Sequence, residues 1–249
     1  MFGPTIRILS SNFHSFSSMI KQYFNPLAVA EVIKLLFSKP SCFLPHAKVE
    51  NIAVIDFDKL KHFGFKRVLF DKDNTLASPY QNTAFCTEIK RSVELCSQAF
   101  GRENVCICSN TAGSEYDKKK NYVAAKELEH IFKVSVVRHR HNKPNVTFRE
   151  VANCFMIIDT AKKIDIRPQE IIVIGDRITG DVMFGNKLGM LTILTKPLAI
   201  QNENYFIKIS RFLEQGILNV IETFGITPPK NPFVSNLPEF RNVIIKKHE

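Results

Sequence analysis

Short apolar, β-prone runs alternate with helical stretches between residues 67 and 194, and this alternation constrains the fold more than any other feature. Strands separated by helical patterns are typical of a parallel sheet with helices on both faces. We expect strands over 67–70, 104–108, 134–137, 170–174 and 191–194, and helices over 83–100, 115–130, 145–158, 179–188 and 202–224. Right-handed crossovers would then bring the carboxyl ends of the strands to one edge of the sheet.

Polar residues that suit phosphate chemistry follow each of the first four expected strands. In chain order they are Asp71 and Asp73, then Ser109, Asn110 and Thr111, then Lys143, and finally Asp176 and Asp181. Open α/β sheets bind ligands at the carboxyl ends of their strands, so we expect these side chains to share one site. Each of these residue groups alone would also fit a plain turn or a solvated lysine. Their order at four successive strand ends is what makes the pattern specific.

The residue types at these strand ends predict a metal-assisted attack on a phosphate ester. A carboxylate such as Asp71 needs a nearby cation before it can approach an anionic phosphate. Mg²⁺ prefers hard oxygen ligands, which Asp71, Asp176 and Asp181 would supply. The Ser109 hydroxyl could bind phosphoryl oxygens.

Two further side chains complete this chemistry. Lys143 would offset negative charge on the nucleophile and on the transferring group. A protonated Asp73 could donate a proton to the leaving oxygen and later deprotonate water. Asn74, at the turn, suits a positive φ better than most residues.

Four motifs resemble those of the haloacid dehalogenase superfamily of phosphatases. The DxDx[TV] pattern matches Asp71 to Thr75, the motif serine matches Ser109, the motif lysine matches Lys143, and the GDxxxxD pattern matches Gly175, Asp176 and Asp181. The resemblance implies an α/β fold, a three-layer Rossmann-like parallel sheet of the haloacid dehalogenase type. It also implies a phosphoaspartyl intermediate on Asp71, acid and base catalysis by Asp73, and Mg²⁺ held by Asp71, the Asp73 main-chain carbonyl and Asp176, with Asp181 close by.

A narrower resemblance covers the residues around the same motifs. The runs 69–75, 109–114 and 173–177, with Arg138-His139 before Lys143-Pro144, are similar to the mitochondrial phosphatidylglycerophosphate phosphatases. This resemblance implies removal of the terminal phosphate of phosphatidylglycerophosphate, a step toward cardiolipin, at the matrix side of the inner membrane. We expect Ser109, Asn110 and Lys143 to bind the phosphate. The intervals between motifs leave no room for a large cap domain, and a soluble phosphoester (a sugar phosphate or a nucleic-acid 3′-phosphate) is the alternative substrate.

The chain is expected to divide into a targeting or membrane-associating segment over 1–50, a phosphatase domain over 51–225 and a tail over 226–249. Residues 1–39 are Ser-rich and carry a single acid, Glu31, which is typical of an organelle transit peptide. A helix is expected over about 26–37, either lying on a membrane surface or packed on the domain. Residues 41–53 are expected to form a connector.

The formal net charge of +10 favours anionic partners, although charge alone does not identify one. We expect an anionic phospholipid substrate and peripheral contact with an anionic membrane, and we leave a homo-oligomer open. Nucleic acid is not expected, because the chain has no basic stripe interleaved with aromatic residues that would stack bases. The six cysteines contain no CxxC pair and are expected to be reduced thiols. No apolar run reaches the roughly 18 residues that a spanning helix needs.

Overall fold

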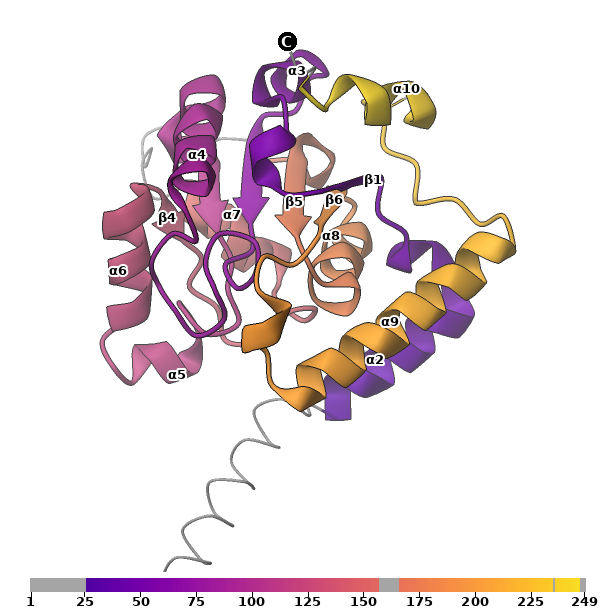
Figure 1. Cartoon of the computed structure of the whole chain (residues 1–249), viewed down its shortest axis with the longest axis horizontal. Helices are drawn as coiled ribbons and strands as arrows, with labels where there is room; N and C mark the ends of the chain where they lie inside the picture. Colours follow the sequence, from indigo (N-terminus) through magenta and orange to yellow (C-terminus); the bar gives the residue numbers. More distant parts are fainter. Residues whose placement is uncertain (1–25, 157–165, 235, 247–249) are drawn as a thin grey trace, which may run out of the picture.

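A six-stranded parallel sheet forms the centre of the protein, as the computed structural model shows for residues 26–156, 166–234 and 236–246 (Figure 1). The strands are β1 (Ala47–Val49), β2 (Arg67–Phe70), β3 (Val105–Ile107), β4 (Ser135–Val136), β5 (Ile171–Gly175) and β6 (Leu191–Thr195). Their order across the sheet is β1-β6-β5-β2-β3-β4, and all neighbours pair in parallel. The predicted parallel sheet is therefore confirmed.

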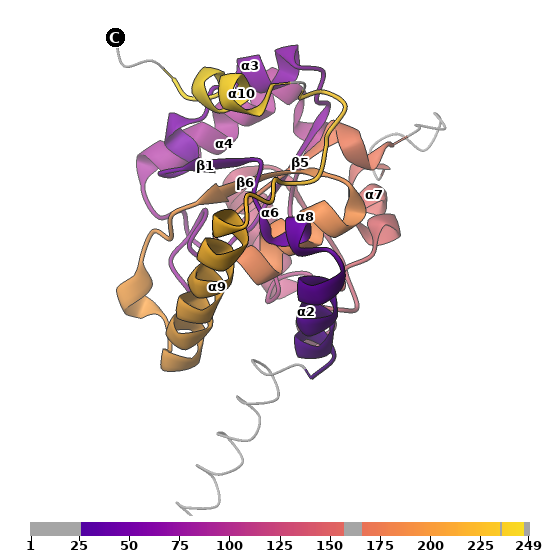
Figure 2. The ribbon, with the colours of Figure 1, turned by 90° about the vertical axis from the view of Figure 1, so that its right-hand side faces the viewer.

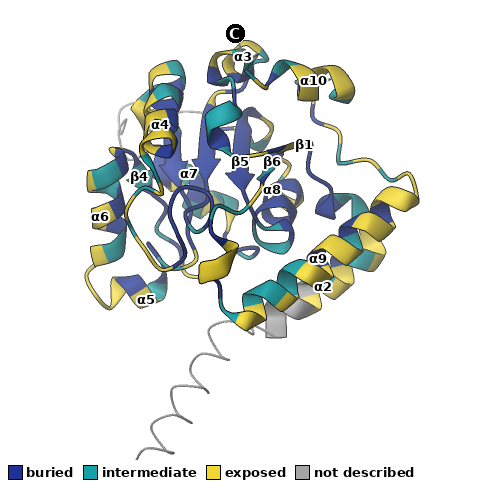
Figure 3. Cartoon of the chain, viewed as in Figure 1, coloured by how far each residue is buried: buried dark blue, intermediate teal, exposed yellow. Residues whose placement is uncertain are grey.

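Helices cover both faces of this sheet because the strands bury side chains on both sides. Along β2, Val68 and Phe70 join one hydrophobic cluster while Leu69 joins another, as the two-residue period of a strand requires. The first cluster contains side chains of α3 (Phe57–His62), α4 (Thr87–Phe100) and α6 (Val123–Phe132). The second contains side chains of α7 (Phe148–Met156) and α8 (Met183–Leu188). The expected three-layer arrangement is thus present, with the buried strands at its centre (Figure 3).

The helix expected over 115–130 is two helices, α5 (Glu115–Lys118) and α6. Asn121 and Tyr122 between them have positive φ values of 54° and 57°, which a continuous right-handed helix excludes. The buried Asp117 carboxylate stabilises this break by accepting hydrogen bonds from the backbone N–H groups of Gly113, Ala124 and Ala125 at 2.8–3.1 Å. The side chain of Asp117 therefore connects the loop after β3 to the start of α6.

The expected connector and the expected tail both contain regular structure that packs on the rest of the protein. Residues 47–49, expected within a connector and assigned to the N-terminal segment, form β1 and pair with the edge of β6. Within the expected tail, α10 (Leu237–Val243) buries Phe240 completely against Phe63 and Phe65. Both segments are short and lack periodicity, so their structure depends on contacts with distant parts of the chain.

The expected helix over 26–37 is present as α2 (Pro26–Ser38), and the last long helix is α9 (Tyr205–Thr223). Both project beyond the carboxyl-end edge of the sheet (Figures 1 and 2). The Ser-rich stretch that predicts a transit peptide lies outside the described residues, as do residues 157–158 of the expected helix over 145–158. From β2 to β4 the described chain adds only the loops and helices around α4, α5 and α6, which agrees with the absence of a large cap domain.

Candidate active site

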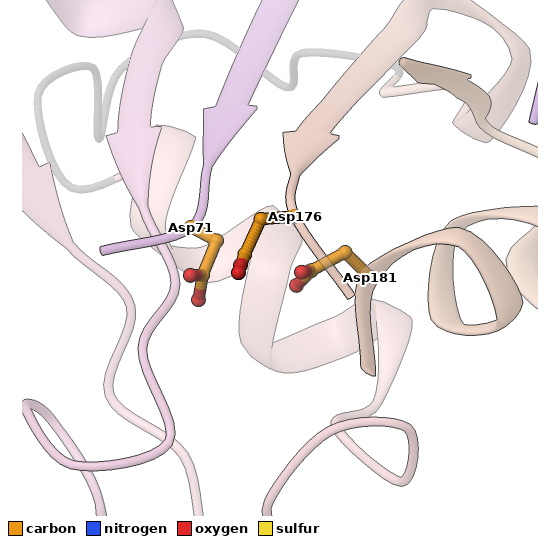
Figure 4. Close-up of side chains that lie close together, drawn as sticks. All are labelled: Asp71, Asp176 and Asp181. Carbon is orange, nitrogen blue, oxygen red and sulfur yellow. The ribbon is translucent and has the colours of Figure 1, made fainter. Parts of the chain in front are cut away.

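Three aspartates from two strand ends meet at the carboxyl edge of the sheet. Asp71 follows β2, Asp176 follows β5, and Asp181 lies in the short π-helix η5 (Ile178–Val182). One carboxylate oxygen from each lies within 4.8 Å of the others, and the three side chains point into the same space (Figure 4). The expectation that Asp71, Asp176 and Asp181 lie close together is therefore confirmed.

Lys143 connects two of these carboxylates from the loop after β4. Its Nζ lies 2.5 Å from Asp71 Oδ1 and 2.5 Å from Asp181 Oδ1. Burial alone would lower the pKa of Lys143, but the Asp181 and Asp71 carboxylates outweigh it and raise the pKa above its usual value. Lys143 therefore stays protonated between the two carboxylates.

The backbone around Gly175 allows Asp181 to come this close. A side chain at Gly175 would place its Cβ only 2.3 Å from Asp181 Cγ, so a residue larger than glycine would displace the carboxylate. The same carboxylate accepts a hydrogen bond from the Arg177 backbone N–H through Oδ2 at 3.0 Å. The glycine and the π-helix together position the second aspartate of the GDxxxxD pattern.

Burial raises the pKa values of two of these carboxyl groups, Asp71 and Asp176. Burial raises the pKa of Asp71 well above its usual value; the neighbouring carboxylates raise it further, and Lys143 partly opposes this rise. Burial also raises the pKa of Asp176 to about 6, despite the opposing guanidinium of Arg211. A cation bound among these groups would favour their ionised forms.

The residues present fit a divalent metal ion that prefers oxygen ligands. Asp176 Oδ1 is buried and has no hydrogen-bond partner, although a buried carboxylate oxygen is normally paired. It lies within the group of three carboxylates that could hold a metal. An ion coordinated there would satisfy this oxygen and reduce the mutual repulsion of the aspartates.

Asp73 lies outside this group, with about a third of its side chain exposed. Its Oδ1 accepts a hydrogen bond from the Tyr80 N–H at 3.1 Å and lies 3.0 Å from Lys72 Nζ, and its Oδ2 lies 3.5 Å from the Thr111 hydroxyl. The positive φ expected at Asn74 is confirmed at 61°. The roles of Asp73 as an acid and base and, through its carbonyl, as a metal ligand stay predictions.

The loop after β3 supports the site through its backbone and its side chains. Ser109 is fully buried, and its Oγ accepts hydrogen bonds from the N–H groups of Thr111 and Ala112. Asn110 Oδ1 accepts a hydrogen bond from the Lys143 N–H at 2.8 Å, so this side chain positions the lysine loop. Phosphate binding by Ser109, Asn110 and Lys143 stays a prediction.

Arg211 of α9 also contacts the site, and no sequence pattern predicted it. Its guanidinium donates to the Asp176 carboxylate and to the main-chain oxygen of Asp176, the latter at 3.0 Å, and it also pairs with the buried Glu203. The helical pattern of 202–224 gave no sign of this contact, because Arg211 and Asp176 lie 35 residues apart.

His139 is a second residue whose position was not expected. Its Nε2 lies 2.7 Å from the Ser109 carbonyl oxygen and its Nδ1 lies 2.9 Å from that of His141. The sequence feature that could have identified His139 is the Arg138-His139 pair, which is part of the resemblance to the phosphatidylglycerophosphate phosphatases. The ring links the loop that carries Ser109 to the loop that carries Lys143.

Comparison with known proteins agrees with this geometry. The family model described as mitochondrial PGP phosphatase matches residues 27–199. The chain belongs to the mitochondrial PGP phosphatase family. Every site residue discussed above except Glu203 and Arg211 lies within the matched range.

Several proteins named as phosphatidylglycerophosphate phosphatases are similar to half of the chain or more. The chain is 34% identical over 223 residues to phosphatidylglycerophosphate phosphatase 1, chloroplastic/mitochondrial, of Arabidopsis thaliana; this covers 89% of the chain but only 60% of that relative. It is 32% identical over 235 residues to the chloroplastic phosphatidylglycerophosphate phosphatase 1 of Chlamydomonas reinhardtii, which covers 91% of the chain and 81% of that relative. A mitochondrial phosphatidylglycerophosphatase of Saccharomyces cerevisiae is 33% identical over 128 residues, which cover 51% of the chain and 65% of that relative. No solved structure matches the chain.

Proposed function

We propose that this protein is a Mg²⁺-dependent phosphatase that removes the terminal phosphate of phosphatidylglycerophosphate to give phosphatidylglycerol. The observation that carries this proposal is the position of Lys143, whose ammonium group contacts both Asp71 and Asp181 beside the unpartnered oxygen of Asp176. Its family relatives are named for this substrate. Their names and the arrangement of charges therefore support the same reaction.

The proposed reaction has two steps on the protein. An oxygen of the Asp71 carboxylate attacks phosphorus, the bond to the glycerol oxygen breaks, and Asp73 protonates that leaving oxygen. Asp73 then removes a proton from water, which attacks the phosphorus of the aspartyl phosphate and releases inorganic phosphate and free Asp71. Exposure of Asp73 to solvent is consistent with access for this water.

The remaining groups would hold the phosphate and stabilise its charge. Mg²⁺, held by Asp71, the Asp73 carbonyl and Asp176 with Asp181 close by, would screen the phosphate oxygens from the carboxylates. Lys143 would compensate negative charge as it develops during transfer. The loop that carries Ser109 and Asn110 would also bind the phosphate.

We place the reaction at the matrix side of the mitochondrial inner membrane, with the protein bound to its surface. In the part of the chain that the structure describes, no helix has both the length and the apolar character needed to cross a bilayer. An uncapped site would let a lipid anchored in the bilayer present its head group directly.

Phosphate release from phosphatidylglycerophosphate micelles, compared with release from sugar phosphates and nucleic-acid 3′-phosphates, tests the substrate. We expect the lipid to be turned over with the higher kcat/KM. A preference for the soluble esters would reject the lipid substrate while leaving the chemistry of the site intact.

The nucleophile is tested separately with Asp71→Asn. We expect turnover to fall by at least about a thousandfold, because an amide oxygen is a far weaker nucleophile than a carboxylate. Circular dichroism would check that the fold is retained. Substantial residual activity in the folded variant would refute the assignment of Asp71.

A further inference from the structure

Helix α9 carries apolar side chains on its outward side as well as on its buried side. Leu218 and Ile221 are buried in the cluster beneath α9. The outward stripe repeats at helical spacing and comprises Tyr205, Phe206, Ile209, Phe212, Leu213 and Val220, continued by Phe224 at the C-cap. Phe212 is 79% exposed and Phe224 is 78% exposed, which is unusual for phenylalanine.

Helix α2 extends the same apolar surface. Its Ile33 and Phe37 are 53% and 84% exposed, and its Leu36 lines a groove together with Phe212, Leu213, Gly216 and Val220 of α9. Of the fifteen large hydrophobic side chains exposed in the described residues, nine belong to α2, α9 or its C-cap. We call this surface, made of the outward sides of α2 and α9, the α2–α9 face. Such a concentration marks an interaction surface rather than scattered exposure.

The charges near the α2–α9 face favour an anionic partner. The acids of α9 are Glu214, buried and paired with Arg177, and Glu222, paired with Lys48 at 2.7 Å. The outward stripe of α9 therefore carries no unpaired carboxylate, whereas Lys34 is exposed on α2 and Lys208 is partly exposed on α9. An apolar stripe bordered by lysines matches a membrane interface, where apolar side chains insert and cations contact anionic head groups.

The buried side of α9 connects this face to the active site. Arg211 bonds to Asp176, while Glu214 accepts hydrogen bonds from the Arg177 side chain and, at 3.1 Å, from the Ile178 backbone N–H. Both α2 and α9 extend past the strand ends that carry the aspartates (Figures 1 and 2). A flat surface that contacts these helices would therefore lie on the same side of the molecule as the three aspartates.

We propose that the α2–α9 face docks the protein on an anionic lipid bilayer and holds the active site toward the head groups. The proposal rests on the proposed lipid substrate for its biological meaning, but the binding itself can be measured without turnover. The partner is the bilayer surface, and a second copy of the chain is the competing occupant.

Co-sedimentation with phosphatidylcholine vesicles, with and without phosphatidylglycerol, tests the docking directly. We expect the full chain to bind the anionic vesicles more tightly. Phe212→Asp should weaken that binding about tenfold or more, because insertion of one large apolar side chain contributes at least that factor. Equal binding of Phe212→Asp and the unaltered chain would overturn the proposal, and so would equal binding to neutral and anionic vesicles.

Two valines of similar exposure provide a matched control. Val220 on α9 is 57% exposed and Val123 on α6, outside the face, is 50% exposed. We expect Val220→Asp to weaken vesicle binding and Val123→Asp to leave it unchanged. Similar losses in both variants would assign the effect to the added negative charge and overturn the specific face.

Two further measurements distinguish membrane docking from a failure of the proposed function and from dimerisation through the same face. Hydrolysis of a short-chain, water-soluble phosphatidylglycerophosphate should be unchanged in Phe212→Asp, while hydrolysis of the same head group in vesicles should fall. If the unaltered chain binds vesicles through Phe212 but hydrolyses neither lipid, the proposed function fails and the docking face stands. If sedimentation velocity shows a dimer that Phe212→Asp dissociates without changing vesicle binding, a second copy occupies the face and the proposal is overturned.

Discussion

Arg211 connects helix α9 to the active site through Asp176. It bridges Asp176 and Glu203 from helix α9. Because a guanidinium donates several hydrogen bonds in a fixed plane, it can hold the Asp176 carboxylate in one orientation. Arg211 is therefore a positioning residue for the proposed metal ligand.

Replacing Arg211 by lysine should lower turnover of a soluble substrate about tenfold or more, because an ammonium group cannot reproduce both bridges. It should also shift the Mg²⁺ concentration that gives half-maximal rate, which a purely structural defect would not do. Lys208→Met, one turn earlier in α9, serves as the control and should leave both quantities unchanged. An unaltered Mg²⁺ response in Arg211→Lys would contradict the positioning role.

His46 gives a residue-scale prediction that does not involve the active site. Its Nδ1 accepts a hydrogen bond from the Thr192 backbone N–H, its Nε2 lies 2.8 Å from the Pro229 carbonyl oxygen, and burial lowers its pKa to about 4. The unfolded chain has a His46 pKa near 6.5, so it binds the proton first as the pH falls. The contribution of His46 to the free energy of unfolding therefore has its full value above about pH 6.5 and is lost as the pH falls toward 4.

Lowering the pH from 7.5 to 5 should reduce the free energy of unfolding by about 2 kcal/mol through His46. Urea unfolding at the two pH values measures this change. The same comparison in His46→Gln isolates the residue, because the variant lacks the titrating group while other groups still titrate. An equal pH dependence in both proteins would show that His46 is not responsible.

At the scale of elements, α10 is part of the folded domain and not a free tail. Phe240 is fully buried, with its ring 5.2 Å from that of Phe63 and 6.4 Å from that of Phe65. The adjacent Ile244 is also buried in the same cluster. Removing α10 would therefore expose one face of the core beneath it.

Phe240→Ala should lower the free energy of unfolding by about 3–5 kcal/mol, because it removes a buried ring and leaves a cavity. Urea denaturation measures this loss. Phe224→Ala, at a position 78% exposed, is the matched control and should change stability by less than about 0.5 kcal/mol. Equal small effects in both variants would mean that α10 does not contribute to the core in solution.

At the scale of the whole molecule, the acidic site opposes folding unless a cation occupies it. Asp71, Asp176 and Asp181 are buried together, and Lys143 and Arg211 compensate them only in part because Arg211 is shared with Glu203. A divalent cation that binds the folded state alone would stabilise it by mass action.

Saturating Mg²⁺ should therefore raise the melting temperature by about 5 °C or more at pH 7.5, since binding at a hundred times Kd contributes about 2.7 kcal/mol. Differential scanning calorimetry with Mg²⁺ and with EDTA measures the shift. Asp176→Asn should lose most of the response. A full Mg²⁺ response in that variant would place the ion elsewhere.

The sequence by itself determined the parallel sheet and the position of the site within it. Alternating strands and helices with right-handed crossovers bring the carboxyl ends of the strands to one edge of the sheet. The sequence alone therefore predicts that Asp71, Lys143, Asp176 and Asp181 lie close together.

Tertiary structure alone decided which distant segments complete the domain and the site. The three residues of β1 become a strand because the edge of β6 offers hydrogen bonds, and Arg211 reaches Asp176 because α9 lies beside the strand ends. Helix α9 has apolar residues on two sides, and periodicity cannot tell which side is buried. Only its packing against the domain turns Leu218 and Ile221 inward and leaves Phe212 exposed, because each outcome depends on contacts far apart in the chain.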